Sequence, residues 1–146
     1  SSLVIYNLGI AGADVYEAGS AVRRTATAGN NLNKIAFAAT GTPLLLPSPG
    51  SRFQIVGTPV SYACDAGTLW RYSGYAFQAA QPVSLATLDA LAGVTRAALA
   101  THLSGCSFAY GPGPLQHNGL VSMSLSFSQG GETVTLQYQV NVDNVP

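Results

Sequence analysis

The C-terminal end of the chain alternates between apolar and polar residues, and this period of two constrains the fold more than any other feature. Between residues 121 and 128 the odd positions are apolar and every even position is a serine. Between residues 134 and 142 the even positions are apolar and the odd ones carry Thr, Gln or Asn. A period of two is typical of a strand with one buried face. Residues 120–128 and 133–142 are therefore predicted to be two β-strands.

Gly130 and Gly131 separate these strands and suit a two-residue hairpin turn, in which both central residues have positive φ. Such a turn brings apolar residues opposite one another in four pairs: Phe127–Val134, Leu125–Leu136, Met123–Tyr138 and Val121–Val140. A slip of one position would place each apolar side chain opposite a polar one, so the pattern also specifies the register. We expect one buried face that contains Val121, Phe127, Leu136 and Val140.

A second hairpin is predicted around Asp65-Ala66-Gly67, read as a three-residue loop in which Gly67 takes the left-handed conformation. The incoming strand would carry Val60, Tyr62 and Cys64 on one face. The outgoing strand would carry Thr68, Trp70 and Tyr72 on the same face, with Tyr62 across from Trp70.

The remaining segments are less regular. Residues 76–103 are rich in Ala and Leu, and Ser84 and Thr95 as N-caps with Gly93 as a stop predict one or two short helices. Residues 40–50 contain three prolines and are predicted to be an extended loop, and residues 9–31 to be a Gly/Ala-rich connection. The predicted fold class is mainly β (α+β), an antiparallel sheet domain with one or two short helices.

The length and charge of the chain limit what it can be. Its 146 residues suffice for one core, so residues 1–146 are predicted to form a single globular domain. Only 8% of the residues are charged, and six basic residues balance six acidic ones. Such a chain has no electrostatic footprint for nucleic acid. No apolar run approaches the ~18 residues of a membrane span, and a weakly charged, Ser/Thr/Asn-rich surface is common among exported proteins.

The two cysteines, Cys64 and Cys106, are 42 positions apart and both lie in apolar, strand-like sequence. They are either two unrelated buried thiols or one disulfide formed in an oxidising compartment. Neither has a second cysteine at CxxC spacing. We favour the disulfide.

The sequence lacks the residue patterns of catalysis or of metal and cofactor binding. The G-x-S-x-G nucleophile motif is absent, and His102 and His117 are the only imidazoles. A structural zinc needs four Cys or His ligands at paired spacing, whereas this chain has two of each, scattered between residues 64 and 117. We expect no enzymatic activity, no metal and no cofactor.

Aromatic residues offer two interpretations. A flat platform on which a sugar stacks could be formed by Trp70, Tyr72, Tyr75, Phe77 and Tyr110. The alternative is a β-sheet core, where aromatic cross-strand pairs are common. Exposure separates the two, so Trp70, Tyr72 and Tyr75 are kept as candidate contacts with a ligand or partner.

Several of these segments resemble the C-terminal part of the MshO-type minor pilin-like proteins of the mannose-sensitive haemagglutinin (MSHA) type IV pilus. The cysteine contexts and the Asp-Asn-Val-Pro ending are the most specific parts of the resemblance, which is carried by residues 3–14, 50–56, 59–65, 69–72, 103–110 and 139–146. The family is more distantly similar to the J-type minor pseudopilins of type II secretion.

The resemblance implies a non-catalytic subunit that helps to initiate or assemble a pilus by docking against other minor pilins or the major pilin. It implies a periplasmic or pilus-surface location, with an inner-membrane anchor only through a long N-terminal helix, which this sequence lacks. The chain would then be a soluble, truncated minor pilin. The alternatives are a glycan-binding adhesin domain at a pilus tip and a minor pseudopilin.

Overall fold

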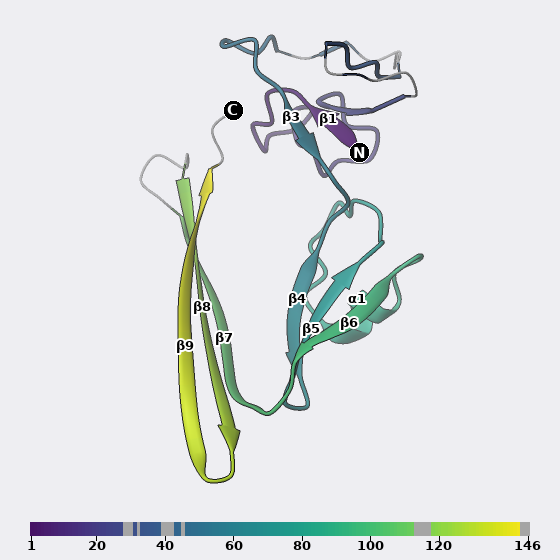
Figure 1. Cartoon of the computed structure of the whole chain (residues 1–146). Coiled ribbons are helices and arrows are strands. Elements are labelled where there is room, and N and C mark those ends of the chain that lie inside the picture. The colour runs from purple at the N-terminus through teal and green to yellow at the C-terminus, as the bar shows by residue number, and fades with distance from the viewer. Residues whose placement is uncertain (28–30, 32, 39–42, 45, 113–117, 144–146) are drawn as a thin grey trace. The chain divides into compact units, whose positions relative to one another are not determined.

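The computed structural model describes the whole chain except residues 28–30, 32, 39–42, 45, 113–117 and 144–146 (Figure 1). In the described part, nine strands form three antiparallel sheets of three strands each, and the one helix is short. Strands make up 48% and helix 4% of the structure, which confirms the prediction of a mainly β chain. The chain divides into two compact units, residues 1–59 with 75–92, and residues 60–74 with 93–145. Each is described by itself.

The first unit contains a small sheet of the order β2-β1-β3. Its strands are β1 (Ser2–Val4), β2 (Arg23–Thr25) and β3 (Gln54–Val56). Strand β2 lies within the segment 9–31 that was expected to be a connection only. Apolar side chains from β1 and the loop before β2 form the core, which contains Val4, Ala13, Val15 and Val22.

Local hydrogen bonds fix the loop that supplies this core. The Glu17 carboxylate accepts the Gly12 N–H at 3.0 and 3.1 Å. The Asn7 side chain accepts the Val15 N–H at 3.0 Å. The Arg23 guanidinium donates to the Val15 carbonyl and lies 4.3 Å from the centre of the Phe77 ring. These contacts hold together a Gly-rich loop whose sequence has low propensity for helix or strand.

The single helix, α1 (Leu85–Asp89), also belongs to the first unit. Ser84 caps it as predicted, because its hydroxyl accepts the Thr87 N–H at 3.2 Å. The prediction of Thr95 as a second N-cap is wrong, since Thr95 begins strand β6. The residues that follow, Arg96 to Ala100, have helical propensity, but pairing with β5 makes them a strand.

The second unit begins with the sheet β4-β5-β6, formed by β4 (Ser61–Asp65), β5 (Thr68–Ser73) and β6 (Thr95–Ala100). The predicted β4–β5 hairpin is present, but its three-residue loop is wrong. Ala66 and Gly67, with φ of 46° and 72°, form a two-residue turn whose twist matches the strands. The register therefore differs by one position, so that Trp70 faces Ala63 and Tyr62 faces Arg71.

The last sheet of this unit consists of β7 (Leu103–Pro112), β8 (Asn118–Gln129) and β9 (Glu132–Asp143), in that order. Gly130 and Gly131 have φ of 63° and 85°, as a primed two-residue turn requires. The predicted register is confirmed at every pair, from Phe127 opposite Val134 to Val121 opposite Val140.

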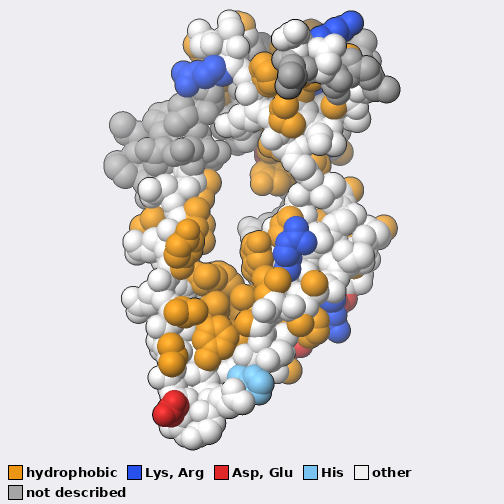
Figure 2. Space-filling view, viewed as in Figure 1, with side chains coloured by type: hydrophobic (Ala, Val, Ile, Leu, Met, Phe, Trp, Pro, Cys, Tyr) orange, Lys and Arg blue, Asp and Glu red, His pale blue; other side chains and the backbone are white. Residues whose placement is uncertain are grey.

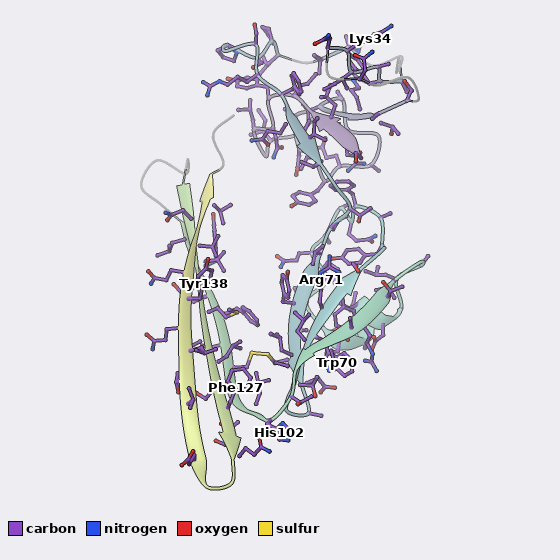
Figure 3. All side chains as sticks on the ribbon, viewed as in Figure 1. Lys34, Trp70, Arg71, His102, Phe127 and Tyr138 are labelled. Carbon is purple, nitrogen blue, oxygen red and sulfur yellow. A yellow bond between two sulfur atoms is a disulfide. The ribbon has the colours of Figure 1, made fainter. Side chains whose placement is uncertain are left out.

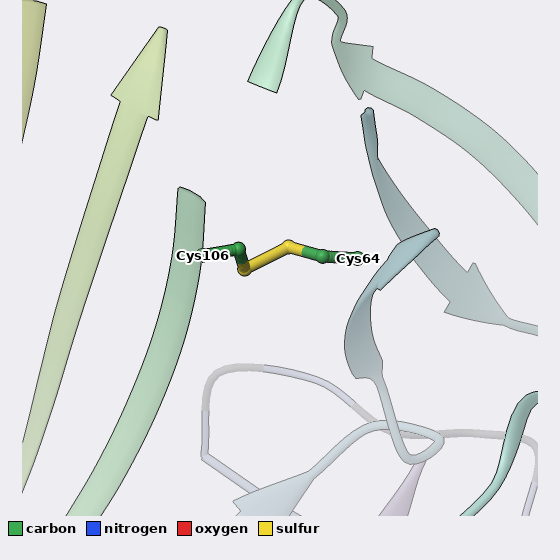
Figure 4. The surroundings of a disulfide bond; sticks show 2 residues. All are labelled: Cys64 and Cys106. Atoms are coloured by element: carbon green, nitrogen blue, oxygen red, sulfur yellow. A yellow bond between two sulfur atoms is a disulfide. The ribbon is translucent and has the colours of Figure 1, made fainter. Parts of the chain in front are cut away.

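A disulfide connects the two sheets of the second unit (Figure 4). Cys64 on β4 and Cys106 on β7 are bonded at an S–S distance of 2.06 Å, which confirms the predicted pairing. The Leu103 N–H also donates to the carbonyl of Gly67 at 2.9 Å. One covalent bond and one hydrogen bond thus hold the start of β7 to the β4–β5 hairpin.

One sequence prediction concerns a segment without regular structure, and another concerns membrane-spanning helices. The described residues of the 40–50 segment belong to no helix or strand, and positions 40–42 and 45 lie outside the described residues. Among the helices that the structure describes, none has the length and apolar character needed to cross a membrane.

Candidate docking surface

Apolar side chains occupy most of one face of the β7–β8–β9 sheet, away from the turn between β8 and β9. Paired residues in an antiparallel sheet share a face, and four rows cross all three strands: Leu103–Phe127–Val134, Cys106–Leu125–Leu136, Phe108–Met123–Tyr138 and Tyr110–Val121–Val140. Figure 2 shows hydrophobic side chains gathered over one side of this sheet, and Figure 3 labels Phe127 and Tyr138 on it. We call this set of four rows the apolar face.

Much of the apolar face is open to solvent. Leu125, on the central strand, is only 4% exposed, whereas its partner Leu136 on β9 is 55% exposed. Val140 is 45% exposed, and Val121 and Phe127 are half-buried. The expectation that Val121, Phe127, Leu136 and Val140 are buried is therefore wrong. Alternation determines which face a side chain occupies, but burial of an edge strand needs a second layer over it.

The opposite face of the sheet is polar and its side chains bond across the strands. The hydroxyls of Ser126 and Thr135 lie 2.9 Å apart. Ser128 contacts the Thr133 hydroxyl at 2.7 Å and donates to the Ser104 hydroxyl at 2.9 Å. Serine and threonine thus form a hydrogen-bonded ladder on this face, as cross-strand pairs of these residues do.

Strand β9 is an edge of the sheet and carries charge only at its two ends, Glu132 and Asp143. Its residues from Thr133 to Val142 are uncharged, and those to Asn141 are all exposed. Natural edge strands are usually guarded by charges, prolines, bulges or short length. Between its charged ends, β9 pairs with β8 in an unbroken register and has none of these devices.

The three candidate aromatic residues lie in different surroundings. Trp70, labelled in Figure 3, is half-buried. The Arg96 guanidinium lies 4.6 Å from the centre of its ring. Tyr72 is fully buried and Tyr75 is 3% exposed. Two of the three rings therefore have no free face on which a sugar could stack. Tyr110, which is 60% exposed, belongs to the apolar face of the other sheet.

The described residues contain no group of three or more His, Cys, Asp and Glu side chains that could hold a metal ion. His102 lies at the bend between β6 and β7, where its Nδ1 is 3.0 Å from the Thr101 hydroxyl. His117 lies outside the described residues. A pocket of about 420 Å³ in the first unit is lined by part of the 12–21 loop with Pro43 and Leu44. Among its described lining residues, Glu17 is ionisable, and its carboxylate already accepts the Gly12 N–H.

Sequence reasoning placed the residues of the apolar face on one side of the sheet correctly but interpreted that side as buried. Comparison of the chain with models of known protein families, with curated proteins and with solved structures found no match.

Proposed function

We propose that this chain is a non-catalytic assembly subunit that works by docking its β7–β8–β9 sheet against other proteins. The observation that carries the proposal is the apolar face, with Phe108, Tyr110, Leu136 and Tyr138 each more than two-fifths exposed. Large contiguous apolar surfaces on soluble proteins mark interaction sites. Aromatic residues are also enriched where protein interfaces are fully buried.

The setting that we propose is a type IV pilus of the MSHA kind, on the basis of the resemblance to minor pilin-like proteins. The partners would be other minor pilins or the major pilin. The protein would act in the periplasm or at the surface pilus, anchored in the inner membrane through the N-terminal helix of its full-length precursor. A disulfide between Cys64 and Cys106 suits an oxidising compartment such as the periplasm.

The glycan-binding alternative has less support. Of the aromatic residues considered for it, Tyr72 and Tyr75 are buried and Arg96 lies over the ring of Trp70. A sugar platform needs a ring face that is open to the ligand.

The experiment that tests the proposal compares two neighbouring residues on opposite faces of β7. Tyr110→Lys puts a charge on the apolar face, and Ala109→Lys puts the same charge on the polar face, at the neighbouring strand position, which is also exposed. We expect Tyr110→Lys in the full-length protein to reduce the number of pili per cell severely, and Ala109→Lys to leave it unchanged. Both purified chains should keep the melting temperature of the wild type. Normal piliation with Tyr110→Lys would overturn the proposal.

A further inference from the structure

The open edge of β9 has a defined set of unpaired main-chain groups. In a two-residue hairpin, the residues that flank the turn form a hydrogen-bonded pair, and bonded and non-bonded pairs then alternate along the strands. Gln129 and Glu132 flank this turn. The even-numbered residues of β9 are therefore bonded to β8. The odd-numbered residues, from Thr133 to Asn141, direct their N–H and C=O groups to the open edge.

The other edge of the sheet is interrupted at both ends. The register of β7 shifts between Leu103 and Gly105, and its last residue, Pro112, has no N–H. Its beginning is held by the disulfide at Cys106 and by the bond from Leu103 to Gly67. Bulges, prolines and covering segments are the usual means of blocking an edge strand. The regular part of β7 is therefore shorter than β9, and β9 offers the longer uninterrupted edge for pairing.

We propose that a second copy of this chain pairs with β9 through its own β9, in antiparallel orientation about a twofold axis. The two three-stranded sheets then form one continuous six-stranded sheet. This inference goes beyond the proposed function and does not depend on the pilus assignment, since it rests only on the edge of β9.

The side chains of β9 favour a register with the twofold axis at Tyr138 over one with the axis at Gln137. Apolar residues occupy the even positions, so a twofold arrangement matches apolar with apolar whenever the axis passes through a residue. With the axis at Tyr138, Leu136 faces Val140 and Val134 faces Val142 of the other copy, and Glu132 falls outside the paired region. With the axis at Gln137, Glu132 would face Val142. The register centred on Tyr138 therefore avoids placing a charge opposite an apolar side chain.

The size of this interface and its lack of charge favour a second copy as the partner. Pairing from Thr133 to Asp143 makes about a dozen main-chain hydrogen bonds, because each of the odd-numbered pairs exchanges two. A typical protein interface has roughly 10 ± 5. The paired region carries no charge between Glu132 and Asp143, so two identical strands do not repel each other along it.

The first test is sedimentation of the whole chain at increasing concentration. The wild type should form dimers, and Gln137→Lys combined with Gln139→Lys should raise the dimer Kd at least ~10-fold, because position 137 faces position 139 of the other copy and like charges then lie directly opposite. The matched control is Ser122→Lys combined with Ser124→Lys. These residues are the β8 neighbours of Gln139 and Gln137 on the same face, so the control adds the same charge one strand further in.

In the control the dimer Kd should stay within about threefold of the wild-type value. A wild-type chain that remains monomeric at ~100 μM, a concentration at which even a weak interface is populated, would overturn the inference. Equal dimerisation by the edge variant and the wild type would overturn it as well.

The second test determines the register by cross-linking. Tyr138→Cys places two thiols across a non-hydrogen-bonded pair at the axis, where Cα atoms are ~4.5 Å apart, so oxidation should give a covalent dimer. Val140→Cys should give none, because its copies lie four residues, or ~13 Å, apart along the strand. Mixing Val140→Cys with Leu136→Cys should restore the cross-link. Cross-linking of Val140→Cys alone, or its absence with Tyr138→Cys, contradicts this register.

Discussion

At the scale of single residues, Leu125 and Leu136 provide a matched comparison because they face each other across β8 and β9. Leu125 is 4% exposed and Leu136 is 55% exposed. We expect Leu125→Ala to lower the free energy of unfolding by ~2–5 kcal/mol, as a cavity in a packed core does. Leu136→Ala should cost well under half as much, since its side chain is already in contact with water. Urea denaturation of both variants measures the difference, and equal losses would contradict the observed burial.

The same pair shows what a sequence can and cannot determine about a residue. The alternation of apolar and polar residues, with Gly130 and Gly131 between the strands, was sufficient to predict that Leu125 faces Leu136. It could not predict their unequal exposure, because burial depends on which other segments lie over the sheet. For the same reason Tyr72 and Tyr75, considered as surface contacts, are buried.

At the scale of elements, the disulfide links β4 to β7 across 42 residues and stabilises the fold by closing this loop. In the chain-entropy model, closing a loop of this length stabilises the fold by about 4 kcal/mol. We expect Cys64→Ala combined with Cys106→Ala to lower the free energy of unfolding by approximately that amount in urea denaturation.

Reduction of the wild-type chain provides the control for this prediction. Cys106 is exposed, so dithiothreitol should reach the bond in the folded protein and bring its urea midpoint to that of the double variant. Thiol labelling of the untreated, denatured wild type should find no free cysteine. An unchanged midpoint in the double variant would show that the bond does not constrain the unfolded chain.

The strands differ in how well their sequences predict them. Strands β8 and β9 were predicted because both alternate over many residues and one short turn joins them. Strand β6 was not, because Thr95–Ala100 is rich in Ala and has no alternation, and only its pairing with β5 makes it a strand. The β4–β5 loop was predicted one residue too long, since Asp65 reads as a turn residue but pairs with Thr68.

At the scale of the whole molecule, the chain divides into two compact units. A destabilising change in one should therefore leave local opening in the other unaltered. Val22 is 2% exposed in the core of the first unit. We expect Val22→Ala to cost about 2 kcal/mol there, which corresponds to roughly 30-fold faster hydrogen exchange in β1 to β3.

Amide exchange in β8 and β9 should not change in this variant, and Leu125→Ala should produce the reverse pattern. Hydrogen exchange measured by mass spectrometry resolves the two units. Equal acceleration in both units by either variant would show that they unfold as one cooperative body.

The hydroxyl ladder on the polar face of the β7–β8–β9 sheet makes the charge of this face independent of pH and salt. Serine, threonine and glutamine side chains, such as those of Ser126, Thr135 and Gln139, stay uncharged throughout the pH range of folded proteins. Because they carry no charge, their interactions are not screened by added salt. Dilution, concentrated salt and moderate acid therefore leave the charge of these side chains unchanged, so the polar face keeps its interaction with water under all three conditions.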